Sequence, residues 1–403
     1  MKADISRTTF DPDKHYSGVF MQQGRVPLDA DWNEQVEIQR RHSLLLARDL
    51  IGEHGGPKAD AGFKVGIGRS GRLLTIGAGR YYVDGLLAEN GQRCAFDAQP
   101  DLPTAPDLLR AAQSRTGTQL AYLDVWERDV TFLDDPALRE VGLGGPDTCV
   151  RRKVVWQVRL GSADEFERGE GSRRVRKRAG RLNVFTTGNG YRGAENHLYR
   201  VEIHRSGGIG TATFKWSRDN GSVVALIESL EGRLLMIDPG AFRAGSAFES
   251  GQWVEISDDA RGLDGDAGDL RRVEAFDSAA GTLTLNEAPS MQLEPSLHPT
   301  VRRWDQVDGG DGGEPTGARR LQLEGGIEVQ FSAGTYRTGD YWLIPARTVG
   351  GAVEWPGADG PEPQPARRTV HHRCALAELE FDARRRTWRV LDDRRRIFAP
   401  LAG

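Results

Sequence analysis

The feature that most constrains this 403-residue sequence is a long stretch near its start without glycine or proline. The chain contains 50 Gly and 19 Pro, yet none lies between residues 29 and 51. Asp31 and Glu34 have the spacing of a capping box, and Gly52 is typical of the position just after a helix. We therefore expect one helix that begins near residues 29–31 and stops at Ile51-Gly52. At about 1.5 Å per residue it would be roughly 30 Å long.

The apolar residues of this predicted helix form one stripe that polar residues interrupt. Trp32, Val36, Leu46 and Leu50 share the stripe, and Gln39 and Ser43 occupy its middle. Arg40 and Arg41 flank it. Such a helix is not stable alone and has two possible partners: the sheet of its own domain, or copies of itself in a bundle whose register the polar layers fix.

The residues before the helix form an arm that contains several aromatic side chains. Asp11-Pro12 and Gly24 are turn signals, so this part predicts an extended arm with one or two short strands. We predict that arm and helix together form an assembly interface. Its candidate residues are Phe10, Tyr16, Phe20, Met21, Arg25, Leu28, Trp32, Val36, Leu46 and Leu50.

Composition favours a β-rich chain with ample core material. Hydrophobic residues make up 38% of the sequence, and the many glycines imply many turns. The net charge of −4 gives no basic field for nucleic acid.

Three cysteines without short spacings, Cys94, Cys149 and Cys374, do not predict a disulfide framework. The N-terminus lacks an apolar signal segment and no later stretch is long enough to span a bilayer, so we expect synthesis in the cytoplasm.

After residue 52 the sequence consists mostly of short apolar runs separated by glycine. Residues 80–87 predict a strand pair that meets at Asp84-Gly85. Residues 108–114 predict a short helix, and Pro136 suits the first position of another helical turn. The fold class that we predict is mainly β, an N-terminal arm and long helix followed by two or three antiparallel β-sandwich or barrel-like domains. The predicted divisions are residues 1–56, 57–205, 206–305 and 306–403.

Four short motifs imitate chemical sites, and each has a simpler interpretation. Residues 66–71 match GxGxxG, but a strand follows where a dinucleotide site needs a helix, which favours a hairpin turn. The basic run at residues 173–178 lacks interleaved aromatics and favours a solvated or partner-facing loop. Residues 264–269 concentrate carboxylates that could hold calcium, although an acidic turn is favoured. His371, His372 and Cys374 offer zinc ligands, but alternation along a strand leaves at most two on one face.

Eight tryptophans are spread through the predicted β segments. They are Trp126, Trp156, Trp216, Trp253, Trp304, Trp342, Trp355 and Trp388. Most are expected in cores, although exposed ones could stack on sugars. A pair of acids that cleaves glycans cannot be recognised from sequence, because such pairs converge in space. We predict no catalytic residue, no metal and no cofactor.

Several stretches together resemble the uncharacterised DUF6519 family. They are residues 10–16 (FDPDKHY), 21–35 (MQQGRVPLDADWNEQ), 213–222 (TFKWSRDNGS) and 336–342 (YRTGDYW). Asp134 to Arg151, with GGPD at residues 144–147, is also similar to that family. The resemblance covers almost the whole chain. The opening also resembles, more loosely, the beginnings of phage tail and fibre proteins.

The resemblance implies a structural part of a contractile injection system, because such proteins are commonly encoded beside baseplate and tail genes. The expected function is that of a baseplate, spike-surrounding or fibre-attachment protein that assembles with other baseplate or tail proteins. A homo-oligomer is expected, with a trimer suggested by the threefold axes of spikes and fibres. The main alternative is a glycan-binding or glycan-cleaving tail-spike module, and a second alternative is a cytosolic assembly chaperone.

Overall fold

The computed structural model describes residues 3–104, 117–167, 179–238, 248–307, 309–357 and 360–401. The chain divides into two compact units, each built from three separate segments. The helix unit comprises Thr8–Arg128, Arg152–Val175 and Thr369–Gly403. The barrel unit comprises Met1–Arg7, Asp129–Arg151 and Arg176–Arg368. The predicted helix at residues 108–114 and the basic run at 173–178 lie outside the described residues.

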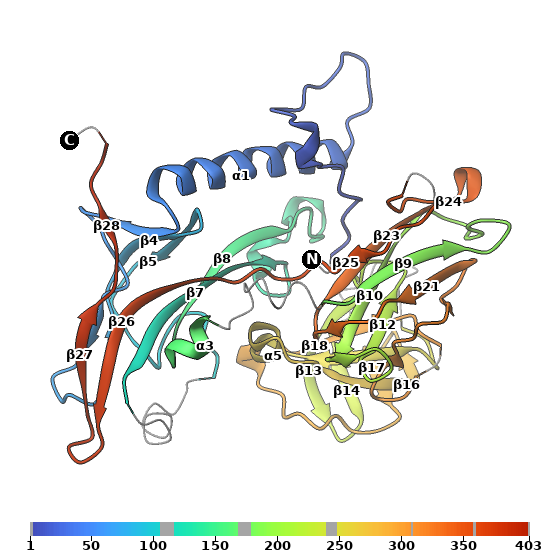
Figure 1. The fold of residues 1–403 in the computed structure, drawn as a ribbon. Coiled ribbons are helices and arrows are strands. Elements are labelled where there is room, and N and C mark those ends of the chain that lie inside the picture. The colour runs from blue at the N-terminus through green and yellow to red at the C-terminus, as the bar shows by residue number, and fades with distance from the viewer. Residues whose placement is uncertain are drawn as a thin grey trace. The chain divides into compact units, whose positions relative to one another are not determined.

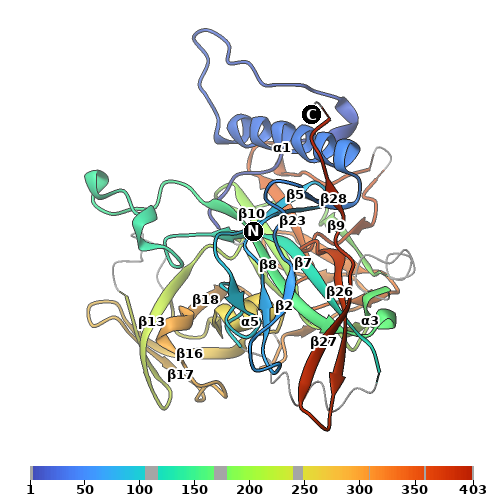
Figure 2. The same cartoon turned by 90° about the vertical axis from the view of Figure 1, so that its left-hand side faces the viewer.

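The helix unit begins with the arm and a single long helix. The arm contains the 3-10 helix η1 (Pro12–Lys14), and α1 spans Asp29–Ile51 before Gly52. Figures 1 and 2 show α1 as the long blue helix, with the arm looping out near its start. One short helix follows later, α3 (Ala163–Glu167).

Three small sheets complete this unit. The first has the order β28-β1-β4-β5, with β28 at Ile397–Phe398, β1 at His54–Pro57, β4 at Gly79–Val83 and β5 at Leu86–Asn90. The second is β2-β3-β6, at Val65–Ile67, Leu74–Ile76 and Cys94–Ala95. The third is β27-β26-β7-β8, at Thr387–Asp393, His372–Asp382, Gln119–Val130 and Arg151–Gly161.

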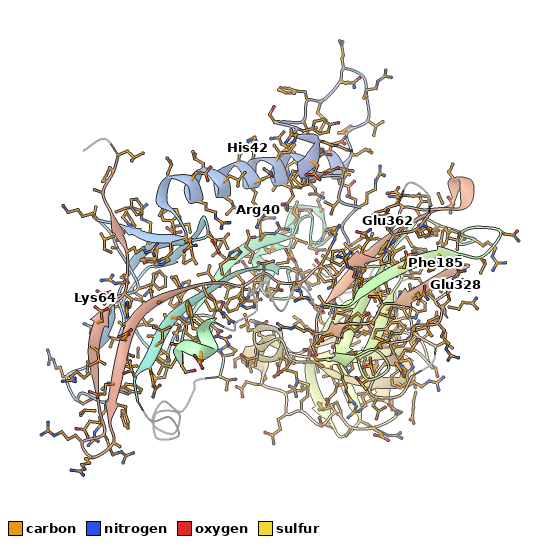
Figure 3. All side chains as sticks on the ribbon, in the orientation of Figure 1. Arg40, His42, Lys64, Phe185, Glu328 and Glu362 are labelled. Atoms are coloured by element: carbon orange, nitrogen blue, oxygen red, sulfur yellow. The ribbon has the colours of Figure 1, made fainter. Side chains whose placement is uncertain are left out.

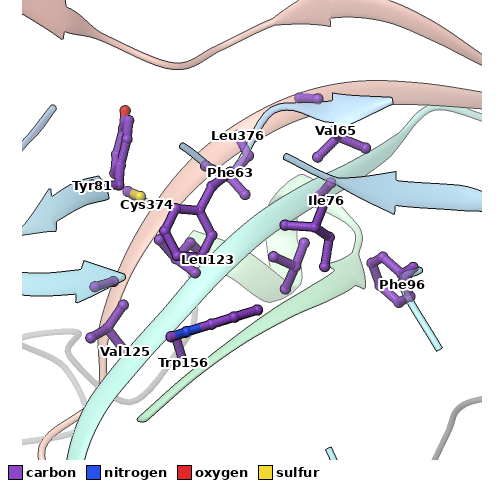
Figure 4. Close-up of a cluster of buried hydrophobic side chains, with 14 of the residues drawn as sticks. Phe63, Val65, Ile76, Tyr81, Phe96, Leu123, Val125, Trp156, Cys374 and Leu376 are labelled. Carbon is purple, nitrogen blue, oxygen red and sulfur yellow. The ribbon is translucent and has the colours of Figure 1, made fainter. Parts of the chain in front are cut away.

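One hydrophobic core joins these sheets, as Figure 4 shows. Phe63 and Trp156 meet edge to face at its centre, with ring centroids 4.9 Å apart. Leu123 on β7 and Leu376 on β26 are fully buried in the same core. Because β26 pairs antiparallel with β7, residues near the C-terminus fill a core that the first third of the chain begins.

The barrel unit contains a closed six-stranded barrel. Its order is β13-β14-β17-β16-β15-β18, at Val224–Glu231, Leu234–Ile237, Thr282–Leu285, Asp269–Asp277, Trp253–Ser257 and Thr300–Trp304. Its interior is apolar, with Val254, Leu283 and Val301 fully buried.

Two further sheets in the barrel unit share a second core, in which Phe214 and Phe331 contact each other. One has the order β19-β12-β10-β23-β24, at Glu314–Pro315, Thr213–Ser217, His197–Arg205, Tyr341–Arg347 and Ala352–Val353. The other is β20-β21-β9-β25, at Leu321–Gln322, Ile327–Phe331, Arg181–Thr186 and Gln364–Pro365. A small pair joins β11 (Gly207–Gly208) to β22 (Thr335–Tyr336). Short helical elements are η2 (Pro136–Leu138), η3 (Val141–Leu143), α5 (Asp259–Asp264), η5 (Pro295–Leu297) and η6 (Val349–Gly351).

The mainly β class is confirmed, and one of the β structures is a closed barrel. The helical turn at Pro136 is also confirmed. Two local predictions are wrong. No strand forms in residues 3–28, because their backbone pairs with no neighbouring strand. Asp31 is not the cap of α1, because the helix already begins at Asp29 and Leu28 occupies the cap position without a side-chain bond.

The Asp84-Gly85 turn forms as predicted and sets the distance between α1 and its sheet. β4 and β5 pair from Gly79↔Asn90 to Val83↔Leu86, and both turn residues have positive φ. A Cβ on Gly85 would lie 2.4 Å from the main-chain oxygen of Leu44 in α1. Only glycine therefore fits where the turn meets the helix backbone.

Replacing Gly85 by alanine should destabilise the protein by about 2 kcal/mol or more. The new methyl group would clash with the backbone of α1, and alanine is strained in the left-handed conformation of this position. Urea unfolding at pH 7 measures the change. Gly91→Ala is the matched control, since no atom lies within 4 Å of its Cβ and its φ is not positive. An equal, small effect of the two substitutions would contradict the packing of α1 on this turn.

Candidate assembly surface

The inner face of α1 is fixed to its own unit. Ile38 is only 1% exposed, and Ala30 is also buried. Leu44 packs against the core of the helix unit. An Arg40–Glu127 pair binds α1 to β7 through both carboxylate oxygens. This half of the helix is therefore a structural contact within the monomer.

A second ionic contact reinforces the same face. Glu37 accepts a 2.6 Å hydrogen bond from Arg152 on β8 and lies 3.5 Å from Arg40. Figure 3 shows Arg40 on the side of α1 toward the sheets and His42 on the opposite side. The orientation of α1 about its axis is thus set by apolar burial and by ion pairs together.

The outer face of α1 carries the predicted apolar stripe, and this stripe is exposed. Trp32 has an exposed fraction of 69%, and Val36, Leu46 and Leu50 are exposed too. Gln39 and Ser43 in the middle are also exposed. We call Trp32, Val36, Gln39, Ser43, Leu46 and Leu50 the outer stripe. Apolar side chains in this number on one helix face are typical of an interaction site.

The arm is attached to the start of α1 and presents further apolar side chains. The Thr9 hydroxyl donates to Glu34, and the Val19 amide donates to Gln35 Oε1 at 2.6 Å. Glu34, which the sequence suggested for a capping box, therefore binds the arm instead. Phe20 is 90% exposed beyond this attachment. The arm thus presents exposed apolar side chains in addition to those of the helix.

Local sequence explains the turn within the arm. Asp11 caps η1 by accepting from the amide of Asp13 at 3.0 Å. Pro12 is the first residue of this short helix, and His15 ends it in a left-handed conformation. The sequence DPDKH is thereby a capped turn, which takes the place of the predicted strands.

The predicted interface residues divide into two groups. The exposed ones are Tyr16, Phe20, Met21, Arg25, Leu28, Trp32, Val36, Leu46 and Leu50. Phe10 is partly buried. Two exposed apolar residues escaped the prediction, Val26 in the arm and Leu45 on α1. A run of three leucines at positions 44–46 was the available signal for Leu45, since they point in three directions around a helix.

The tryptophans of the β segments provide little exposed aromatic surface. Seven are buried, namely Trp126, Trp156, Trp216, Trp253, Trp304, Trp342 and Trp388. Trp355 packs against the second core of the barrel unit and donates its indole N–H to the Glu362 carbonyl. Among all nine tryptophans of the chain, which all lie in described residues, Trp32 is the exposed one.

The GxGxxG motif is a hairpin turn, as predicted. β2 and β3 pair on either side of it, and the amide of Gly68 donates to the Leu73 carbonyl. Gly71 has a φ of +73°, which explains the glycine at that position. No helix starts here to receive a pyrophosphate.

The three acidic residues at positions 264–269 lie at the end of a helix, in the following loop and at the start of a strand. Asp264 ends α5, which Gly265 caps in a left-handed conformation, and Asp269 begins β16. Asp269 accepts from the amide of Ser290 at 2.6 Å and from its hydroxyl at 2.8 Å. Burial raises the pKa of Asp269, but these hydrogen bonds outweigh burial and the pKa is lowered. In the part of the chain that the structure describes, no three His, Cys, Asp or Glu side chains are grouped to hold a metal ion.

The two consecutive histidines bind separate carboxylates rather than a shared ligand. His371 Nδ1 lies 2.9 Å from Asp124, and His372 Nδ1 lies 2.9 Å from Asp84. Cys374 is buried, and burial raises the pKa of its thiol. Asp124 and Asp84 lie far earlier in the sequence than the histidines. No sequence motif near the histidines therefore identified these two carboxylates as their partners.

Asp124 is the centre of a buried ionic contact in the helix unit. Its carboxylate is 0% exposed and accepts from His371 and from Arg373 at 3.2 Å. Arg159 approaches to 3.8 Å. Burial raises the pKa of Asp124, but the hydrogen bond from His371 and the charges of Arg373 and Arg159 outweigh it, so the pKa is lowered. The charged form stabilises the fold.

The barrel unit has its own buried ionic network. Lys215 on β12 binds Glu255 on β15 and lies 3.4 Å from Glu202 on β10, which accepts a 2.6 Å hydrogen bond from Arg200. All four are buried, and Arg302 adds a third positive charge that interacts with Glu255 and Glu202. Burial, then the charge of Lys215, lowers the pKa of neighbouring His204 to about 4. The network connects the barrel to the adjoining sheet, and its opposite charges pair within the fold as in a structural contact.

The fold and surface together define a mainly β protein with an exposed apolar surface on one long helix. Among the described residues, no helix combines the length and apolar composition that a membrane crossing requires. A family model described as "Family of unknown function (DUF6519)" matches residues 1–170 and 180–385, and the chain belongs to this family. No curated protein matches the chain, and no solved structure does.

Asp124→Asn should lower the free energy of unfolding by about 2–3 kcal/mol at pH 7. The substitution removes the buried negative charge that His371, Arg373 and Arg159 surround. Since the folded-state pKa is lowered, the stabilisation is present above the ordinary aspartate pKa of about 4. It is lost as the pH falls through the folded-state value. Urea unfolding at pH 7 and pH 3 should therefore show a difference from wild type that shrinks with acid.

Asp60→Asn is the control for this measurement. Asp60 pairs with Arg80 at 2.9 Å, but both side chains are nearly half exposed. We expect a change below about 1 kcal/mol. A loss of stability by Asp124→Asn that was no larger, or that grew toward pH 3, would contradict the assignment of the charged Asp124 as a stabilising group.

Proposed function

We propose that this protein is a structural component of a contractile injection system or phage-tail-like particle, and that it acts through protein–protein assembly. Its place would be in the baseplate, around the spike, or at a fibre attachment. The single observation that carries the proposal is the exposed outer stripe of α1, beside which the arm also has exposed apolar residues. The particle class rests on the resemblance to proteins encoded beside baseplate and tail genes.

The way in which α1 is held supports an assembly role. Ile38 and the Arg40–Glu127 pair fix the helix, so its outer face is presented by a rigid element. A preordered surface loses little conformational freedom when it binds. Exposed Trp32 is the residue type that most often anchors an interface, because it buries a large apolar area with few rotatable bonds.

The remaining parts of the proposal follow from this role. The partners are other baseplate or tail proteins and further copies of the chain, with threefold symmetry by analogy to spikes and fibres. The β-sheets and the barrel serve as rigid spacers without a catalytic centre or cofactor. The protein is made in the cytoplasm and becomes part of the assembled particle.

No specific observation favours the glycan-binding alternative. Stacking on sugars needs exposed aromatic rings on a β surface, and the tryptophans of the β segments lie in or against cores. Trp32, the exposed tryptophan, lies on α1 beside aliphatic residues.

The double substitution Trp32→Glu with Leu46→Glu should lower the amount of this protein in purified particles at least tenfold. Each change places a carboxylate on an exposed position, so the monomer should keep its wild-type thermal unfolding temperature. Quantitative mass spectrometry of purified particles measures incorporation. Full deletion of residues 1–52 is a less suitable test, because it would also remove buried Ile38.

Val349→Glu is the control, since Val349 is an exposed apolar residue of η6 in the barrel unit. We expect wild-type incorporation for this variant. Undiminished incorporation of the double variant would refute the assembly surface. Complete absence of the wild-type protein from particles would refute the proposed function itself.

A further inference from the structure

The outer stripe of α1 has the spacing of a coiled-coil seam. Its six residues, Trp32, Val36, Gln39, Ser43, Leu46 and Leu50, follow one another at intervals of four, three, four, three and four. This alternation is the a/d pattern of the heptad repeat. Over fewer than three heptads, an α-helix drifts only about 20° per heptad from a straight seam. The stripe therefore stays on one side of α1.

The seam lies opposite the face that packs within the monomer. At about 100° per residue, the seam is centred roughly 180° from Ala30 and Arg48. Ala30 is buried, and Arg48 lies 3.7 Å from Asp84 of the β4–β5 turn. One side of α1 thus packs within the chain itself, whereas the apolar residues of the heptad side are exposed.

The order of residues along the seam indicates which partner helix fits it. In either direction along the helix, the seam has two apolar, two polar and two apolar residues, and it is centred on position 41. Covering Gln39 or Ser43 with an apolar partner would cost about 1–3 kcal/mol for each polar group left without a hydrogen bond. A second copy places polar groups opposite polar groups, whichever direction it runs.

The positions beside the seam also permit contact between copies. They are Asn33, Gln35, Arg40, His42, Ala47 and Asp49. Arg40 is neutralised by Glu127 of its own chain, and Gln35 accepts from the Val19 amide. The flanks therefore contain no block of like charge that would keep two copies apart.

We propose that the outer stripe of α1 packs against the same stripe of a second copy of this chain, with Gln39 and Ser43 level with their counterparts. The result is a short homotypic coiled coil. A free helix of this length would be marginal in water, but α1 is already ordered by its inner face. This inference rests on the proposed function, because it names the partner of the surface described there.

Engineered cysteines test both the partner and its direction. Starting from Cys149→Ser, which removes the exposed native thiol, Ser43→Cys and Gln39→Cys are prepared in the full-length chain. In a parallel pair, Ser43→Cys alone should give more than half disulfide-linked dimer under mild oxidation. In an antiparallel pair, position 43 faces position 39, so dimer should form only when the two variants are mixed. Both the parallel and the antiparallel result support the proposal. The parallel arrangement is also compatible with a threefold assembly.

Arg48→Cys is the matched control, because its side chain is 57% exposed yet lies on the other side of α1. It should give no dimer above background. Light scattering of the wild type should show a mass above that of the 44.4 kDa monomer, and Trp32→Glu with Leu46→Glu should return it to the monomer. Absence of every cross-link together with a monomeric wild type overturns the inference. If that double variant still fails to enter particles, the stripe binds a different particle protein and the proposed function stands.

Discussion

The packing of the inner face of α1 on its own unit is the contact on which the functional argument depends. Ile38 is buried, Gly85 touches the helix backbone, and Arg40 binds Glu127. Full burial of one isoleucine contributes about 2–3 kcal/mol, and the ion pair fixes rotation about the helix axis. Without these contacts the helix could turn its apolar stripe inward. With them, the stripe must face solvent or another polypeptide.

This contact depends in turn on strands that lie far apart in sequence. Glu127 belongs to β7, which pairs with β26 across about 250 residues of chain. β28, near the C-terminus, pairs with β1 directly after α1. The helix unit is therefore complete only when the last segment of the chain has joined it. The barrel differs, because its six strands come from the single stretch Val224 to Trp304.

Sequence reasoning succeeded where local chemistry decides the structure. Glycine at positions 52, 71 and 85 marks the end of α1 and two turns, because each adopts a backbone that other residues resist. It failed where tertiary contacts decide. The arm residues have strand-like composition but meet no partner strand, and Glu34 binds Thr9 instead of capping the helix. The carboxylates that bind His371 and His372 could not be chosen from sequence, because strand pairing brings them together.

The direction of the apolar stripe was the most consequential question that sequence left open. Gln39 and Ser43 are compatible with a helix on its own sheet or with a bundle of copies, because polar groups are tolerated at a partly wet contact and in a matched layer alike. The structure places them on the solvent side. There they cost nothing in the free monomer, but they restrict the partner to one with polar groups at the same height.

The distribution of tryptophan also indicates that the outer stripe contacts another polypeptide. Eight of the nine tryptophans are buried or pack against a core. Trp32 remains on the surface of an anchored helix, beside Val36 and in the same stripe as Leu46. An indole ring exposed at that position buries little apolar area in the isolated monomer, so it contributes little to folding. Its placement is explained when a second polypeptide covers it.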